Sequence, residues 1–377
     1  MGRTRAANGM GSIRQRPDGR WEARYTGLDG KQHSVYAKGQ KEIVAALKAA
    51  QHDVDRGAWI EPSRMTMNQW LDLWLADYQG HTTGRTVETY RSVIKNHMRP
   101  VFGNVKLSSF GSVHVRRMVA SMKSLSPSTI KHARGILSAA LNDAKEAGLV
   151  KSNPVETVKG PRTVKPEFAI VDREHIPAFI EAAHGHPLGN AMIFLLLTGL
   201  RVGELRGLRW SDIDMERQTM RIERQLRQVN KNDIRIGPPK DGEQRTVYLT
   251  PEAINLLKQQ RKDQLADKLK AADWYEDEIT RDLVFRMPTG RNLTQNAIYA
   301  AVTSLRDPLG LPTLRAHDLR HSYAVAALRS GIDVKTVQHN LGHKHASITL
   351  DIYAQYTEDA GRQAAEKFSA YLQNALK

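Results

Sequence analysis

The chain of 377 residues contains no cysteine. This excludes a disulfide framework, a thiolate zinc site, an iron–sulfur cluster and a cysteine nucleophile. The longest apolar stretch, Ala191 to Leu200, is far shorter than the ~20 residues that span a bilayer. The first residues, Met1 to Ala6, lack the apolar segment of a secretory signal. We therefore expect a soluble, cytoplasmic protein.

Two further kinds of motif are missing. The sequence has no G-x-x-x-x-G-K-[ST] loop and no G-x-G-x-x-G after a strand, so we expect neither nucleotide hydrolysis nor a dinucleotide cofactor. The acidic run Asp273 to Glu278 consists of adjacent residues that do not converge on a metal ion. The zinc motif H-E-x-x-H does not occur in the sequence. We predict an activity without a metal or other cofactor.

Positive charge, in contrast, is abundant and unevenly placed. There are 56 Lys and Arg against 40 Asp and Glu, a formal net charge of +16. Residues 1–64 carry +5 (12 basic, 7 acidic), residues 65–168 carry +8 (15 and 7) and residues 169–377 carry +3 (29 and 26). A basic surface can simply aid solubility, but an excess concentrated before a nearly balanced half favours nucleic-acid-binding modules.

The first segment has the pattern of a small sheet followed by a helix. Turns at 18–19 and 29–30, both Asp-Gly, separate short stretches in which apolar and polar residues alternate. This predicts three antiparallel strands. Residues 40–56 have helical spacing of apolar residues and end before Gly57. The exposed face of the sheet would carry Arg14, Arg16, Arg24 and Lys31.

The middle segment is predicted to be an all-helical bundle. The expected helices cover residues 70–78, 85–98, 113–122 and 127–148. Pro100 should end the second, and Ser126 is the N-cap of the last. Lys131 and Arg134 decorate an outer face and are candidates for gripping DNA, although a merely solvated surface fits the helices equally well. Lys151 to Glu167 reads as an extended linker.

The last segment is mixed and mainly helical. Short strands are expected at 219–222, 234–237 and 245–249, forming a small antiparallel sheet. The expected helices cover residues 174–184, 191–197, 253–268, 294–305, 317–330, 334–341 and 348–356. Arg201 directly follows the apolar helix that ends near residue 197. A charge drawn inward there needs a partner, either Glu204 or a bound anion.

Two more motifs follow. In His317-Asp318-Leu319-Arg320-His321-Ser322, His317 and Arg320 are three residues apart and share a helix face, which suits two donors aimed at one phosphate. The third motif, Leu341-Gly342-His343-Lys344-His345, precedes Tyr353 in Leu-Asp-Ile-Tyr.

In this order, Thr-Gly-Leu-Arg-x-Gly-Glu-Leu, His-x-Leu-Arg-His-Ser and Leu-Gly-His with a tyrosine ten residues on resemble the motifs of the tyrosine recombinase, or phage integrase, family. The likeness covers essentially the whole chain. It implies an arm-type DNA-binding domain at 1–60, a core-binding helical domain at 65–151, a linker at 152–168 and a catalytic domain at 169–377.

The resemblance also implies residue roles. Tyr353 would attack a scissile phosphate, giving a 3′-phosphotyrosyl bond and a free 5′-hydroxyl. Arg201 and Arg320 would hold the two non-bridging oxygens. His317 and His343 would supply hydrogen bonds and proton handling.

Other assignments remain open. Lys240 is our candidate for the lysine that protonates the leaving 5′-oxygen, and Lys231 is its rival. Glu204 would buttress the arginine motif rather than transfer protons. Tyr356 is the close competitor of Tyr353 for the nucleophile. His321 in the second motif and His345 in the third are expected to be structural.

The resemblance implies a site-specific recombinase, or integrase, of a phage or other mobile element. It would need no metal or ATP, act as a homotetramer on core-type and arm-type sites, and pass through a Holliday junction. A host bending factor and an excisionase are expected partners, in the nucleoid of a bacterial host. The rivals are a type IB topoisomerase and a chromosome-dimer resolvase, both disfavoured by the separate N-terminal module, and a non-catalytic DNA-binding regulator.

Overall fold

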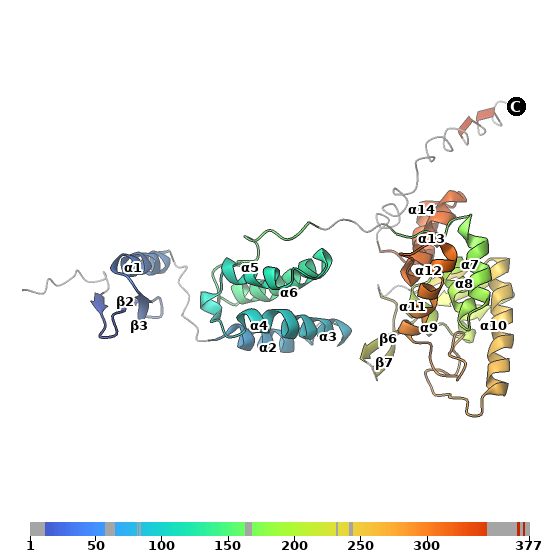
Figure 1. The fold of residues 1–377 in the computed structure, drawn as a ribbon, viewed down its shortest axis with the longest axis horizontal. Helices are drawn as coiled ribbons and strands as arrows, with labels where there is room; N and C mark the ends of the chain where they lie inside the picture. Colours follow the sequence, from blue (N-terminus) through green and yellow to red (C-terminus); the bar gives the residue numbers. More distant parts are fainter. Residues whose placement is uncertain are drawn as a thin grey trace, which may run out of the picture. The chain divides into compact units, whose positions relative to one another are not determined.

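The structure is a computed structural model (Figure 1). It describes residues 12–56, 65–162 except 81 and 83, 168–344 except 231–232 and 241–243, and the pairs 368–369 and 372–373. The chain divides into two compact units, Met1–Val164 and Lys165–Lys377. Within the described ranges, no helix is long and apolar enough to cross a membrane.

The N-terminal module is a three-stranded antiparallel sheet with one helix. Its strands, in spatial order, are β1 (Ser12–Gln15), β2 (Trp21–Thr26) and β3 (Gln32–Ala37). Gly19 and Gly30 in the two turns have φ of +79° and +72°, which glycine adopts without steric cost. Helix α1 (Gln40–Asp55) covers one face of the sheet. The core between them contains Ala23, Tyr25, Ile43 and Leu47. The predicted sheet and helix are confirmed.

The bundle follows in the same unit. Its helices are α2 (Met67–Tyr78), α3 (Gly84–Val93), α4 (Arg99–Phe102), α5 (Ser112–Ser121) and α6 (Pro127–Glu146), with a π-helical turn at Ile94–Met98 and a 3-10 turn at Leu107–Ser109. Ser126 caps α6 as predicted, accepting the Thr129 N–H at 3.1 Å. The prediction that Pro100 ends a helix is wrong. Pro100 lies in the first turn of α4, where its missing N–H costs nothing.

The segment expected to be a linker is partly folded. Val155 and Val158 are 4% and 7% exposed and belong to the apolar core of the bundle. Asn153 fixes this return, because its side-chain amide donates to the Ser138 carbonyl at 3.0 Å. The bundle therefore extends beyond residue 151, and the prediction of an extended chain from residue 151 is wrong for this first part.

The second unit is mainly helical. Its helices are α7 (His175–His184), α8 (Gly189–Thr198), α9 (Val202–Gly207), α10 (Pro251–Lys270), α11 (Gln295–Ser304), α12 (Arg306–Leu309), α13 (Ala316–Arg329) and α14 (Val334–Leu341), with a 3-10 turn at Trp210–Asp212. The apolar helix α8 is almost wholly buried and packs against α7, α10, α11 and α13. It thereby sets the position of the first motif, which begins at its last residue.

Two small sheets complete this unit. One contains, in spatial order, β4 (Ile213–Asp214), β5 (Thr219–Ile222) and β8 (Arg245–Tyr248). The other is a hairpin of β6 (Gln225–Asn230) and β7 (Asp233–Gly237). Three of these strands were predicted and a small antiparallel sheet is confirmed, but β7 pairs with β6 in the hairpin rather than with β5 or β8. β4 and β6 were not predicted.

Candidate active site

Arg201 lies at a sharp connection between two helices. Helix α8 ends at Thr198, and Gly199 takes a left-handed φ of +64°. A Cβ at Gly199 would lie 2.5 Å from the ring of Tyr323, so glycine is required both for conformation and for space. The turn leaves Arg201 as the N-cap residue of α9.

Glu204 is the partner that Arg201 needs. Its carboxylate accepts the backbone N–H of Arg201 at 3.1 Å and the guanidinium Nη1 at 3.0 Å. The other terminal nitrogen, Nη2, donates to the Gly342 carbonyl at 2.7 Å. Of the two partners that the sequence left open, Glu204 is therefore present, and Arg201 also contacts the third motif.

Arg320 joins the same cluster from the second motif. It projects from α13 and is 2% exposed. Its Nη1 donates to the Gly199 carbonyl at 2.8 Å, and its Nη2 donates to the Leu341 carbonyl at 2.6 Å. Backbone oxygens from the first and third motifs therefore fix this guanidinium. Motifs more than a hundred residues apart meet at one place.

Three histidines lie beside the arginines. The ring of His317 meets that of His321 edge-on, with centroids 4.7 Å apart. Burial lowers the pKa of His321 and that of His343 to about 3, and nearby positive groups, including Arg320, act in the same direction. Desolvation also lowers the pKa of His317, although this residue as a whole is exposed. All three imidazoles are thus neutral at neutral pH.

Sequence reasoning missed Arg245, which ties the cluster together. At the start of β8 its side chain is 3% exposed and donates Nη1 to Glu204 Oε1 (3.2 Å) and Nη2 to Oε2 (2.8 Å). Its Nε donates to the Asn340 carbonyl at 2.8 Å. Burial alone would raise the pKa of Glu204, but Arg245, Arg201 and Arg320 together lower it. The available signal was the strand alternation, which puts Arg245 on the same side as buried Val247.

Of the remaining candidates for catalytic roles, the structure describes Lys240 alone. Lys240 lies exposed in the turn between β7 and β8, the connection where a lysine was expected. Its rival Lys231 lies outside the described residues. So do Tyr353, Tyr356 and His345. Their roles stay predictions.

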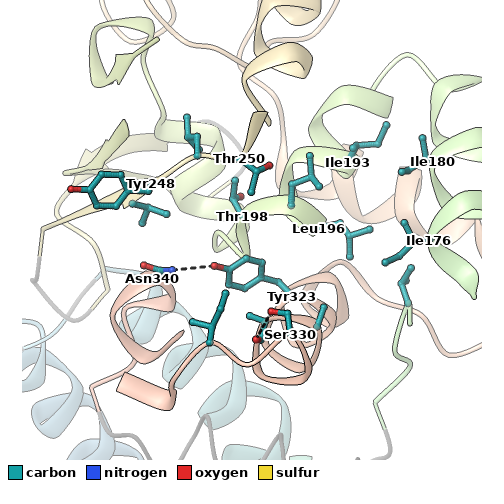
Figure 2. Close-up of a pocket in the computed structure, with 17 residues that line it drawn as sticks. Ile176, Ile180, Ile193, Leu196, Thr198, Tyr248, Thr250, Tyr323, Ser330 and Asn340 are labelled. Atoms are coloured by element: carbon teal, nitrogen blue, oxygen red, sulfur yellow. Dashed lines mark hydrogen bonds between the residues drawn. The ribbon is translucent and has the colours of Figure 1, made fainter. Parts of the chain in front are cut away.

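Tyr323, by contrast, is placed and does not suit a nucleophile. An apolar pocket of about 490 Å³ opens between α7, α8, β8, α13 and α14, and Figure 2 shows the Tyr323 ring reaching into it. The Tyr323 hydroxyl accepts from the side-chain amide of Asn340 at 3.2 Å. Burial raises the pKa of this phenol.

The predicted DNA-binding arginines of the sheet lie on the face that α1 does not cover. Arg14 and Arg24 both bind the carboxylate of Glu22, and Arg16 lies over the ring of Tyr36 with its guanidinium carbon 5.6 Å from the centroid.

The two candidates on α6 differ. Lys131 is exposed and lines a shallow hollow with Tyr90. Arg134 is partly buried, and its Nη2 donates to the carbonyls of Val155 (3.2 Å) and Val158. Arg134 therefore holds the returning chain on the bundle, and its role as a DNA contact stays a prediction.

The site combines positively charged guanidiniums with neutral imidazoles. Two guanidiniums are held in place by backbone oxygens, and the histidines beside them carry no charge of their own. Among the described residues, no three His, Asp or Glu side chains are grouped so that they could hold a metal ion. Two fixed guanidiniums beside neutral imidazoles suit a tetrahedral oxyanion such as a phosphodiester.

Comparisons with known proteins agree with this chemistry. A model of the phage integrase family matches residues 170–359, and a model of the phage integrase N-terminal SAM-like domain matches residues 66–123. A tyrosine recombinase XerC-like protein of Caldanaerobacter subterraneus is 28% identical, covering 88% of this chain and 90% of the relative. A putative prophage phiRv2 integrase of Mycobacterium tuberculosis is 27% identical, covering 97% and 96%.

Solved structures show the shared fold. The Tn1549 transposon integrase in complex with a circular-intermediate DNA has a TM-score of 0.68 at 21% identity, covering 81% of this chain and 99% of that one. A lambda integrase tetramer bound to a Holliday junction has a TM-score of 0.60 at 18% identity, covering 92% and 96%.

Proposed function

This chain belongs to the phage integrase family of tyrosine recombinases, and we propose that it cuts and rejoins DNA through a 3′-phosphotyrosyl intermediate at Tyr353. It is a tyrosine-type site-specific recombinase of a phage or other mobile element. The observation that carries the mechanism is the convergence of Arg201 and Arg320, each fixed by at least one backbone carbonyl of another motif.

The arginine pair would hold the scissile phosphate. Each guanidinium suits a non-bridging oxygen, and the charge that develops on these oxygens in the transition state is stabilised where Arg201 and Arg320 already stand. Because backbone carbonyls, and for Arg201 also the Glu204 carboxylate, position both groups before DNA arrives, little reorganisation is needed. Glu204 and Arg245 support this arrangement through their ion pair and the bond from Glu204 to Arg201, and they do not touch the phosphate.

The covalent step is a balanced exchange. The Tyr353 oxygen bonds to phosphorus as the bond from phosphorus to the 5′-oxygen breaks. The phenol proton leaves to a neutral imidazole, for which His317 is the candidate, and the 5′-oxygen takes a proton from Lys240. His343 supplies a hydrogen bond, because its pKa of about 3 makes it a weak base. The reverse attack by a 5′-hydroxyl of the partner strand rejoins the DNA. The phosphodiester energy is conserved, so neither ATP nor a metal ion is required.

DNA contacts outside the active site would follow the excess of basic residues. We assign arm-type sites to the N-terminal sheet, with Arg14, Arg16 and Arg24, and core-type sites to the bundle, with Lys131, and the catalytic domain. A host bending factor and an excisionase would act with it in the nucleoid of a bacterial host.

Recombination would require a homotetramer that passes through a Holliday junction. The C-terminal stretch carries Phe368 and Leu372 at helical spacing, 63% and 43% exposed. We propose that this stretch enters the apolar pocket of a neighbouring protomer (Figure 2). Since the chain lacks cysteine, Ile180→Cys with Phe368→Cys tests this by oxidation: a cross-linked dimer on DNA supports docking between protomers, and a cross-link within one chain overturns it.

The central experiment is covalent trapping. A nicked suicide duplex built from the DNA flanking the gene is incubated with the protein in EDTA. The proposal predicts an adduct that survives denaturation, that is lost in Tyr353→Phe and that persists in Tyr356→Phe. Tight binding without an adduct would favour a non-catalytic regulator. Relaxation of supercoils by a protein that never joins two sites would favour a topoisomerase.

A further inference from the structure

Glu22 occupies an unusual position on the N-terminal sheet. Its neighbours along β2, Ala23 and Tyr25, are packed into the core with α1, so strand alternation puts Glu22 on the uncovered face. A carboxylate on an uncovered face is ordinarily well solvated. Glu22 is nevertheless only 3% exposed.

The side chains that cover Glu22 are the predicted DNA-binding arginines. Arg14 lies directly opposite on β1, and its Nε donates to Oε2 at 2.7 Å. Arg24, two residues along β2, donates its Nε to Oε1 at 3.2 Å, and Ser34 on β3 donates its hydroxyl to the same oxygen at 3.2 Å. One carboxylate thus holds two arginines, one on each oxygen.

Both arginines still face solvent. The side chain of Arg14 is 60% exposed and that of Arg24 is 43% exposed. Ion pairs this exposed add little to stability. What the arrangement does achieve is to restrict two long, flexible side chains before any ligand arrives, and that lowers the entropy lost on binding. The hydrogen bond from Arg14 is the main reason that the pKa of Glu22 falls to about 2, so its charge persists throughout the neutral range.

We infer that Glu22 is a positioning residue for sequence recognition, fixing Arg14 and Arg24 side by side so that their guanidiniums read base edges in arm-type DNA. This inference rests on the proposed role of the sheet in DNA binding. Strands placed in a groove can present side chains to base edges, and arginine paired with guanine is the commonest specific contact. A carboxylate that faces DNA repels phosphate, so its presence on this face costs general affinity and is explained by what it does to the arginines.

The inference predicts two effects of opposite sign. Glu22→Gln removes a negative charge from the DNA-facing surface and should strengthen binding to unrelated DNA. The same change weakens the hold on both arginines and should reduce the preference for the best base pair, about tenfold at the positions they read. Glu22→Asp keeps the charge but is one methylene shorter. It should lose the preference without the gain in general binding.

The test uses the full chain and a pool of random duplexes, from which the wild type selects its preferred motifs. The double variant Arg14→Ala with Arg24→Ala identifies which motif the sheet reads. Competition with single-base-pair variants of that motif then gives the base preference of wild type, Glu22→Gln, Glu22→Asp and the charge-matched control Asp55→Asn, an exposed residue at the end of α1.

The outcomes separate cleanly. We expect both Glu22 variants to show a reduced base preference while Asp55→Asn keeps that of the wild type. The NMR amide resonances of the sheet should be unchanged in all three variants. Unchanged preference in a folded Glu22→Asp protein overturns the inference while leaving arm binding in place. If the double arginine variant selects the same motifs as the wild type, the sheet does not read DNA, and the proposed function of the module fails instead. Should Glu22→Gln unfold the sheet, Glu22→Asp alone decides.

Discussion

Two pairs of arginines in this protein are fixed in different ways. On the N-terminal sheet, Arg14 and Arg24 are held by a single carboxylate, that of Glu22, and keep much of their surface in water. In the second unit, Arg320 is held by two main-chain carbonyls, and Arg201 is held by one main-chain carbonyl together with the Glu204 carboxylate. A side-chain partner can be exchanged by one substitution, whereas a carbonyl moves only if the fold moves. The first pair therefore suits a recognition surface that changes with its target, and the second suits unchanging chemistry.

The largest expected effect is on Arg320. Arg320→Lys keeps the charge but cannot reach the Gly199 and Leu341 carbonyls together while also meeting a phosphate. We expect the rate of adduct formation on the suicide duplex to fall by at least ~10²–10³-fold, with DNA binding little changed. The matched substitution Arg24→Lys should leave the cleavage rate at a core-type site unaltered. Equal rates for Arg320→Lys and wild type would remove the contrast between the two pairs.

Next is the buried support, Arg245. Arg245→Met would leave the Glu204 carboxylate buried with one of its partners gone, at a cost of about 3–5 kcal/mol in the free energy of unfolding. Arg221→Met on the neighbouring strand β5, whose side chain is 57% exposed, is the control and should cost under ~1 kcal/mol. Urea denaturation measures both. Similar costs would mean that Arg245 is not the link between the motifs.

Removing residues 1–64 should act on binding rather than chemistry. The logarithm of the affinity for arm-type DNA should depend less steeply on the logarithm of the salt concentration, by ~0.9 for each phosphate that the module neutralises in the full chain. Cleavage of a core-type suicide duplex should persist. A salt dependence equal to that of the full chain would show that the basic residues of this module do not bind phosphate.

A smaller effect concerns pH. The pKa of His321 and that of His343 lie near 3, mainly because of burial, whereas histidine in an unfolded chain titrates near ~6.5. Their contribution to stability is complete above pH ~6.5 and is lost as the pH falls toward 3, by up to ~1.4 kcal/mol per unit for each histidine. Glu22, with a pKa of about 2, contributes no change between pH 7 and 5.5. Hydrogen exchange at these two pH values should show weaker protection of α13 at the lower one. Equal protection of α13 would contradict the buried neutral histidines.

Local patterns were enough to predict much of this fold. The Asp-Gly turns at Gly19 and Gly30 fixed the sheet, and the Ser126 cap fixed the start of α6, because turns and caps depend on neighbouring residues. The three motifs were predicted to act together from their likeness to a family, and the structure brings Arg201 and Arg320 together. Tyr353 stays a prediction.

What the sequence did not reveal depends on contacts between distant segments. Val155 and Val158 sit in a stretch rich in proline and glycine, and nothing local shows that the bundle has room for them. Arg245 binds Glu204 across 41 positions, and Glu22 is buried by a residue on another strand. Such pairings follow from register and packing, which a single sequence does not display.

The measurement that tests the central claim most directly replaces one non-bridging oxygen of the scissile phosphate with a methyl group. This methylphosphonate removes the negative charge that Arg201 and Arg320 are proposed to neutralise. Adduct formation at Tyr353 by wild type, Arg201→Ala and Arg320→Ala is compared on the two substrates, with Tyr353→Phe as the inactive control. On the phosphate substrate, each arginine variant should lose ~10²–10³-fold in the rate of adduct formation. On the methylphosphonate, we predict that the loss falls to under ~10-fold for at least one of the two variants. Undiminished losses for both on the neutral substrate would contradict the proposal that these arginines neutralise the phosphate.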